Sequence, residues 1–163
     1  MKNFMILSVF IVAFLSCDKD DSQLKVDSSN LKLETITSVK IGNDIDNNVT
    51  LDYSNSDILS TFAIFSIKNK LDLQPQSMEV IDVDSQKYLR IYSKDEKVST
   101  IALIKDENGH YRTGETICTS SQCSSSGGCL PNGQYCTKCI PNPNSPLKGD
   151  CTRTTSSGGE PNT

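Results

Sequence analysis

The strongest chemical signal in the sequence is a cluster of cysteines in its last third. Thiols at this density can form disulfides, hold a soft metal such as zinc, or exchange disulfides with a partner. Each of these chemistries requires a different setting. The six residues lie among Ser, Gly, Pro and Asn: Cys118, Cys123, Cys129, Cys136, Cys139 and Cys151.

Structural disulfides are the favoured prediction for this set. Cys136 and Cys139 have the spacing of a zinc knuckle, but a four-cysteine zinc site uses a second such pair, which the sequence lacks. A redox pair of thioredoxin type begins a helix at its first cysteine, and Pro141 and Pro143 prevent a helix there. Six cysteines allow three bridges with fifteen pairings, which the sequence does not distinguish. A zinc-binding module is the alternative.

The region that carries these cysteines has little else to stabilise it. Its large apolar residues from position 118 onward are Leu130, Tyr135, Ile140 and Leu147. Each disulfide contributes about 2 to 4 kcal/mol by restricting the unfolded chain. The cross-links therefore replace a hydrophobic core in residues 118–151, and residues 152–163 are predicted to be a disordered tail.

The start of the chain predicts export. Lys2 is followed by an apolar run over residues 4–15, and the run ends at Ser16 and Cys17. A transmembrane helix needs about 20 apolar residues, so this run is too short to be one. It has the organisation of a secretory signal, which places the downstream cysteines in an oxidising compartment.

Residues 1–21 resemble the signals of bacterial lipoproteins, in which the cysteine after the apolar run becomes the lipidated N-terminus. The acidic residues Asp18, Asp20 and Asp21 resemble the tether of surface-exposed lipoproteins of the Bacteroidota. The resemblance implies an outer-membrane lipoprotein of the cell envelope, with Cys17 acylated and the membrane as a partner through that lipid. It also sets Cys17 apart from the six cysteines that can pair.

The remaining chain has the length of one modest domain. Residues 1–16 are interpreted as the signal peptide, 17–30 as a flexible tether, 31–117 as a small β-rich domain and 118–151 as the cysteine-rich module. The expected fold class is α+β or mainly β: an antiparallel β-meander with one helix, followed by a small disulfide-rich loop module.

The meander is expected in the second half of the domain. Residues 78–83, 88–93, 98–105 and 111–117 each alternate apolar and polar side chains, and short polar connectors separate them. Asn108 and Gly109 favour a tight hairpin turn. Leu89, Ile91, Ile101 and Leu103 are expected to share the core face.

Earlier elements are less sharply patterned. Residues 54–71 favour a helix, with Ser54 and Asp57 in a capping-box arrangement, although a buried strand is the alternative. This segment should pack on the meander. Residues 31–41 read as a strand with a bulge, and residues 42–48 as a turn.

Nothing in the sequence forms a catalytic set. The single histidine, His110, follows a turn and is expected to be solvated, and no nucleophile elbow, phosphate loop or dinucleotide fingerprint occurs. A net charge of −4 without a basic stripe argues against nucleic acid as a partner. The sequence therefore favours a non-catalytic binding or structural module, with no cofactor and no metal, acting on a protein or glycan partner. A disulfide-rich inhibitor or toxin-like effector is the rival.

Overall fold

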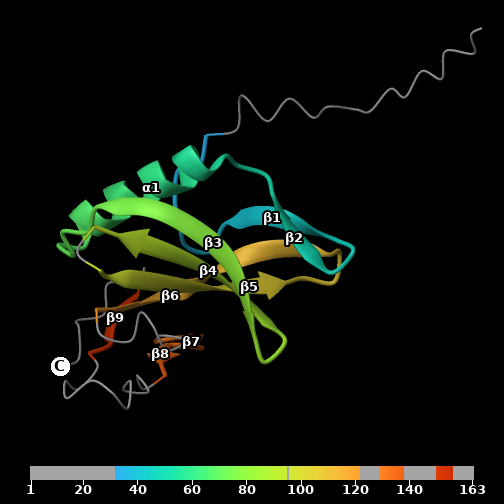
Figure 1. The fold of residues 1–163 in the computed structure, drawn as a ribbon. Helices are drawn as coiled ribbons and strands as arrows, with labels where there is room; N and C mark the ends of the chain where they lie inside the picture. Colours follow the sequence, from blue (N-terminus) through green and yellow to red (C-terminus); the bar gives the residue numbers. More distant parts are fainter. Residues whose placement is uncertain (1–31, 95, 122–128, 138–149, 156–163) are drawn as a thin grey trace, which may run out of the picture.

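The computed structural model describes residues 32–94, 96–121, 129–137 and 150–155. In these residues the protein is mostly antiparallel sheet with one helix, as the sequence predicted (Figure 1). The elements in chain order are β1 (Lys40–Ile45), β2 (Asn48–Leu51), α1 (Asn55–Lys68), β3 (Pro75–Val83), β4 (Gln86–Ser93), β5 (Val98–Lys105), β6 (His110–Ser120), β7 (Pro131–Asn132), β8 (Tyr135–Cys136) and β9 (Thr152–Thr155).

The four predicted meander strands are confirmed as β3 to β6. They lie in the order β6-β5-β4-β3, and each pairs antiparallel with the next along the chain. Asp84 and Ser85 turn the chain between β3 and β4 with φ angles of 51° and 65°. Gly109, with φ of 80°, turns it into β6. Both turns use the positive φ that tight hairpins need.

The helix predicted within residues 54–71 is confirmed as α1, which ends at Lys68, and the residue that precedes it explains why it begins here. The Ser54 side chain accepts a hydrogen bond from the Asp57 backbone N–H at 3.2 Å, so it caps the helix N-terminus. At the other end Asn69 closes the last turn by donating to carbonyls of the helix. This cap starts a helix ahead of the β-branched residues of the segment. The segment is therefore the predicted helix and not the alternative strand.

The hydrophobic core lies between α1 and one face of the sheet. Ile58 and Phe62 of the helix are completely buried against the sheet, as expected. The predicted inward set of the meander, Leu89, Ile91, Ile101 and Leu103, belongs to the same cluster. The side chains on the opposite face of β4, β5 and β6 therefore face the cysteine-rich module.

The predicted strand over residues 31–41 is wrong for most of its length. Only its last two residues enter β1; residues 32–39 have no regular structure, and Ser38 has a positive φ of 57°. Leu33 and Ile36 are nevertheless buried in the core. These two residues are three positions apart, so their burial comes from the packing of an irregular segment and not from the period-2 pattern of a strand.

The predicted turn over residues 42–48 is shorter than expected. Its first four residues belong to β1, and the reversal occurs at Asp46 and Asn47, which have φ angles of 53° and 62°. β1 and β2 form the hairpin around them.

The predicted disorder after Cys151 is wrong for residues 152–155, which form β9. This strand pairs with residues 116–119 of β6, while β1 pairs with the beginning of β6. The long β6 thus has two different neighbours along one edge. The cysteine-rich segment is consequently joined to the main sheet rather than placed after it as a separate unit.

Candidate functional site: the bridged hairpin

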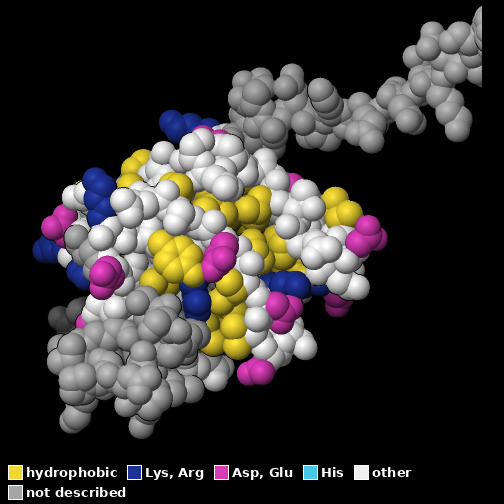
Figure 2. All heavy atoms as spheres, in the orientation of Figure 1, with side chains coloured by type: hydrophobic (Ala, Val, Ile, Leu, Met, Phe, Trp, Pro, Cys, Tyr) yellow, Lys and Arg dark blue, Asp and Glu magenta, His cyan; other side chains and the backbone are white. Residues whose placement is uncertain are grey.

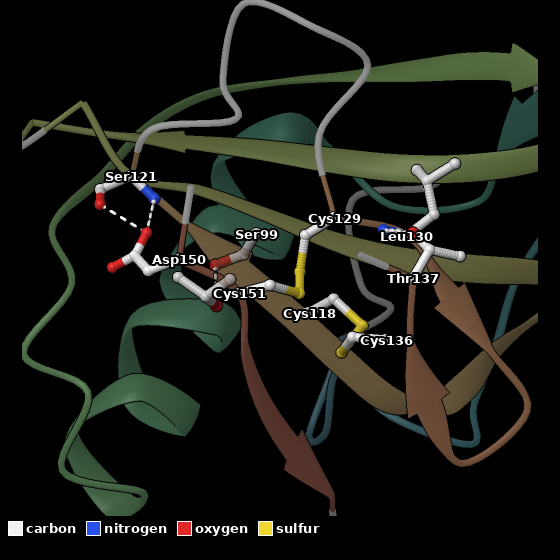
Figure 3. The surroundings of a disulfide bond; sticks show 10 residues. Ser99, Cys118, Ser121, Cys129, Leu130, Cys136, Thr137, Asp150 and Cys151 are labelled. Carbon is white, nitrogen blue, oxygen red and sulfur yellow. Dashed lines mark hydrogen bonds between the residues drawn. A yellow bond between two sulfur atoms is a disulfide. The ribbon is translucent and has the colours of Figure 1, made fainter. Parts of the chain in front are cut away.

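Among the described residues, two disulfides organise the cysteine-rich segment. They join Cys118 to Cys136 and Cys129 to Cys151, with Cα–Cα distances of 5.7 and 5.8 Å (Figure 3). These separations are ordinary for disulfides. The disulfide prediction is therefore confirmed for four of its six cysteines. Cys123 and Cys139 lie outside the described residues, as does the proposed lipidation site, Cys17.

The sheet provides the fixed end of this arrangement. Cys118 is fully buried in β6. It pairs with Thr100 of the adjacent strand β5, and Thr100 pairs with Arg90 of β4. On each of these strands a residue next in sequence to Arg90, Thr100 or Cys118 points into the core. Because successive side chains of a strand point to opposite faces, Cys118 points to the other face of the sheet. Its bridge holds Cys136, and with it β8, against that outer face.

A second set of contacts fixes the ends of the segment. The backbone N–H and the hydroxyl of Ser121 donate to one carboxylate oxygen of Asp150, at 3.0 and 2.7 Å. This pair lies close to the Cys129–Cys151 bridge (Figure 3). The hydrogen bonds therefore join the residue that follows β6 to a residue shortly before β9.

Between these anchors β7 and β8 form a small hairpin. Gly133, with φ of 60°, occupies the first turn position, where glycine is favoured in hairpins. At the base, Leu130 and Thr137 exchange two hydrogen bonds of 2.9 and 2.8 Å. Arg153 of β9 donates to the Gln134 carbonyl at 2.9 Å. The hairpin is thus fixed at its base and at its turn.

The ring of Tyr135 is a large hydrophobic group that this hairpin leaves exposed. It is 72% exposed, and the guanidinium carbon of Arg153 lies 5.9 Å from its centre, within the range of a cation–π contact. A large aromatic side chain held outward on a bridged hairpin is typical of an anchor for a partner. Sequence reasoning named Tyr135 only as one of few apolar residues. Two features of the sequence could have indicated its position on a bridged hairpin: the turn residue Gly133 before it and Cys136 directly after it.

Two clefts flank the hairpin turn. One, of about 500 Å³, lies toward β6, and its lining includes Arg112, Gly114 and Thr116. The other, of about 440 Å³, lies toward the β3–β4 turn. Both are lined by Ala102 and Ile104 of β5 and by Pro131 and Gly133 of the hairpin. We call them the β6 cleft and the β4 cleft.

The β4 cleft combines a ring with polar groups. Its lining includes Tyr88, Asp84 and Asn132. Burial raises the pKa of the Tyr88 hydroxyl, and the nearby Asp84 charge adds to the effect. Tyr88 therefore stays protonated at neutral pH, and the cleft offers the donors and acceptors that a hydroxyl-rich ligand can use.

The sulfur atoms of the two bridges form one cluster. The Sγ atoms of Cys118, Cys129 and Cys136 lie within 4.8 Å of one another. Such convergence is what a thiolate zinc site needs, but zinc binds thiolates, and these sulfurs are bonded to each other or to Cys151. The residues in this oxidised state do not supply zinc ligands.

His110 lies away from this cluster, at the beginning of β6. Its backbone N–H donates to Asp106 Oδ1 at 2.9 Å, and its ring Nδ1 lies 3.3 Å from Asp106 Oδ2. Hydrogen bonds from the backbone of His110 and Asn108, together with the His110 ring, hold the pKa of Asp106 below its usual value. These contacts stabilise the turn between β5 and β6.

The hydrophobic side chains visible on one face of the molecule gather over β3 and the strands beside it, with charged side chains scattered around them (Figure 2). Among the described residues, no helix is long and apolar enough to cross a membrane. Comparison of the chain with protein-family models, curated proteins and solved structures finds no match.

Proposed function

We propose that the protein is a cell-envelope lipoprotein, anchored to the outer membrane through Cys17, which presents the β7–β8 hairpin to a protein or glycan partner and performs no catalysis. The observation that carries the proposal is the hairpin itself. It is bridged to the sheet, holds Tyr135 outward and has a cleft on each side.

The orientation of the chain supports display. Thr61 of α1 donates to the Leu33 carbonyl at 2.9 Å, which fixes the beginning of the described chain on the helix side of the sheet. The hairpin lies on the opposite side (Figure 1). The described chain thus begins on the side of the sheet opposite the hairpin.

Rigidity supports binding. A side chain that is fixed before binding loses little conformational entropy when a partner covers it. The disulfide at Cys136 and the contacts of Arg153 restrict the hairpin at two separate points. The polar lining of the β4 cleft favours a glycan as the ligand of that cleft.

Binding is tested with the oxidised protein, residues 18–163, applied to a glycan panel and to intact cells. Replacing Tyr135→Ala should abolish binding, whereas Ile64→Ala should preserve it. Ile64 is the matched control because it is 53% exposed on α1, on the other side of the sheet. Equal binding by the two variants, or no binding by the unmodified protein, would refute the display role.

Anchoring is tested separately. Cells that express the full chain are fed a palmitate analogue, and the protein is then examined for the label and for release by external protease. The label should be present in the unmodified chain and absent from Cys17→Ala. An unlabelled chain in both cases would contradict the lipoprotein assignment.

The exposed hairpin is also the feature that favours the second candidate, a disulfide-rich inhibitor. Its Pro131–Asn132 strand and Gly133 turn form a bridged loop of the kind that can enter a protease cleft. A panel of proteases assayed with the whole oxidised protein discriminates the two roles. Inhibition at micromolar concentration that is lost on Tyr135→Ala would favour the inhibitor.

A further inference from the structure

Each of the two bridges joins one buried cysteine to one more accessible cysteine. Cys118 and Cys129 are 0% and 1% exposed, while Cys136 and Cys151 are only partly buried. The two buried sulfurs belong to different bridges, yet they lie within 4.8 Å of each other. Figure 3 shows the bridges side by side. This arrangement brings a sulfur of one bridge into the neighbourhood of the other.

We propose that the paired bridges are a thiol–disulfide exchange site that accepts two electrons from an external dithiol and responds by forming a new bridge between Cys118 and Cys129. The accessible residues Cys136 and Cys151 then become free thiols. The inference is independent of the binding role above, because it rests only on sulfur positions and burial.

The exchange begins at the accessible end of a bridge. A thiolate of the external dithiol attacks Cys151 Sγ, and Cys129 leaves as a thiolate. The second thiol of the reductant attacks the mixed disulfide, which releases Cys151 and the oxidised, cyclic form of the reductant. Cys151 takes up a proton. One bridge has been broken, and two electrons have entered the protein.

The second step moves the reduction to the other bridge. The Cys129 thiolate attacks Cys118 Sγ, the Cys118–Cys136 bond breaks, and Cys136 leaves as a thiolate that takes up a proton. The attack starts from a short separation, because Cys129 Sγ already lies within 4.8 Å of both sulfurs of that bridge. The number of disulfides is unchanged in this step.

Burial determines the direction of the exchange. A thiolate is destabilised in an apolar setting, so the negative charge is more stable on Cys136 than on fully buried Cys129. Attack of the reductant at Cys136 instead leads to the same product, since the released Cys118 thiolate then attacks Cys129. Either entry point yields a buried bridge and two accessible thiols.

The product changes the site. The bridge from β6 to Cys136 is what ties the hairpin to the sheet, so the exchange releases β8 from that covalent tie. It also leaves Cys136 and Cys151 as accessible thiols, each of which can react with a disulfide of a partner.

The test is differential alkylation of the whole oxidised protein. It is titrated with dithiothreitol to the dose at which half of Cys151 reacts with a first alkylating reagent. The remaining bridges are then fully reduced and treated with a second reagent of different mass, and tandem mass spectrometry places each label. Fragment ions are needed because Lys138 is the first tryptic site after Arg112, so one peptide holds both Cys118 and Cys136.

If the exchange occurs, Cys136 and Cys151 should carry the first label. Cys118 and Cys129 should carry only the second label. First label on Cys129 and Cys151 together, with Cys136 unlabelled, would overturn the proposal. So would first label on Cys118. The double variant Cys118→Ala with Cys136→Ala is the control: without an acceptor bridge, the first label should move back to Cys129.

Discussion

Removing the Cys129–Cys151 bridge by substituting both residues with alanine should lower the free energy of unfolding by about 3 kcal/mol. The bridge spans a sequence separation of 22 residues. Closing a loop of that length in the unfolded chain costs about 3.4 kcal/mol in the chain-entropy model, and the bridge removes that cost from folding.

The matched variant removes Cys118 and Cys136 in the same way. Its bridge spans a sequence separation of 18 residues. The cost of closing this loop in the unfolded chain is only about 0.2 kcal/mol smaller than for the Cys129–Cys151 loop. Both variants also delete one buried sulfur, because Cys118 and Cys129 are almost completely buried. The two losses should therefore be equal within the precision of the measurement.

Urea unfolding followed by circular dichroism, with intact mass as a check of the remaining bridges, measures both losses. With a slope of about 1 to 3 kcal/mol per molar urea, each midpoint should fall by about 1 to 3 M. A midpoint unchanged in either variant would refute the reasoning. Losses that differ by more than about 1 kcal/mol would show that native contacts, and not loop entropy, dominate.

Three further outcomes follow from the fold. Phe62→Ala should lower the free energy of unfolding by about 3 to 5 kcal/mol because the ring is completely buried, whereas Ile64→Ala, 53% exposed, should change it by less than about 0.5 kcal/mol. Gly42→Ala should destabilise the β1–β2 hairpin, which hydrogen exchange would report, because the added Cβ would meet the Thr50 carbonyl oxygen. Asp106→Ala should remove part of the stability gained as pH rises from the lowered pKa of this carboxyl toward its ordinary value of about 4, because a carboxyl whose pKa is lower in the folded state stabilises the fold when it is ionised. An acid-unfolding midpoint identical in both proteins would contradict that last expectation.

The meander could be predicted from the sequence because its signal is local. Strand alternation and turn residues coincide over β3 to β6, and the helix carries its own cap at Ser54. By contrast, Leu33 and Ile36 are buried without forming a strand, because the irregular segment that carries them packs into the core. Such burial depends on tertiary packing, which the pattern of one segment does not contain.

The site was predicted in part. Its cysteines were found by their density, and their oxidised state was expected from the interpretation of residues 1–16 as a signal peptide. Their pairing depends on which sulfurs the sheet brings together. β9 was missed because Thr-Arg-Thr-Thr is short and polar, and its pairing with β6 is decided by partners outside the segment. Tyr135 was not singled out, since both its exposure and the contact of Arg153 with its ring depend on how the hairpin is placed in the fold.

The position of Cys118 also bears on how the protein matures. It lies on β6, whose partner strand β5 is its immediate neighbour in sequence, so this cysteine is placed by contacts that form early in folding. Its partner Cys136, and Cys129 with Cys151, come later in the chain. The finished sheet can therefore act as a template that selects among the fifteen pairings during oxidation. Once the sheet has folded, correct pairing then requires an oxidant more than an isomerase.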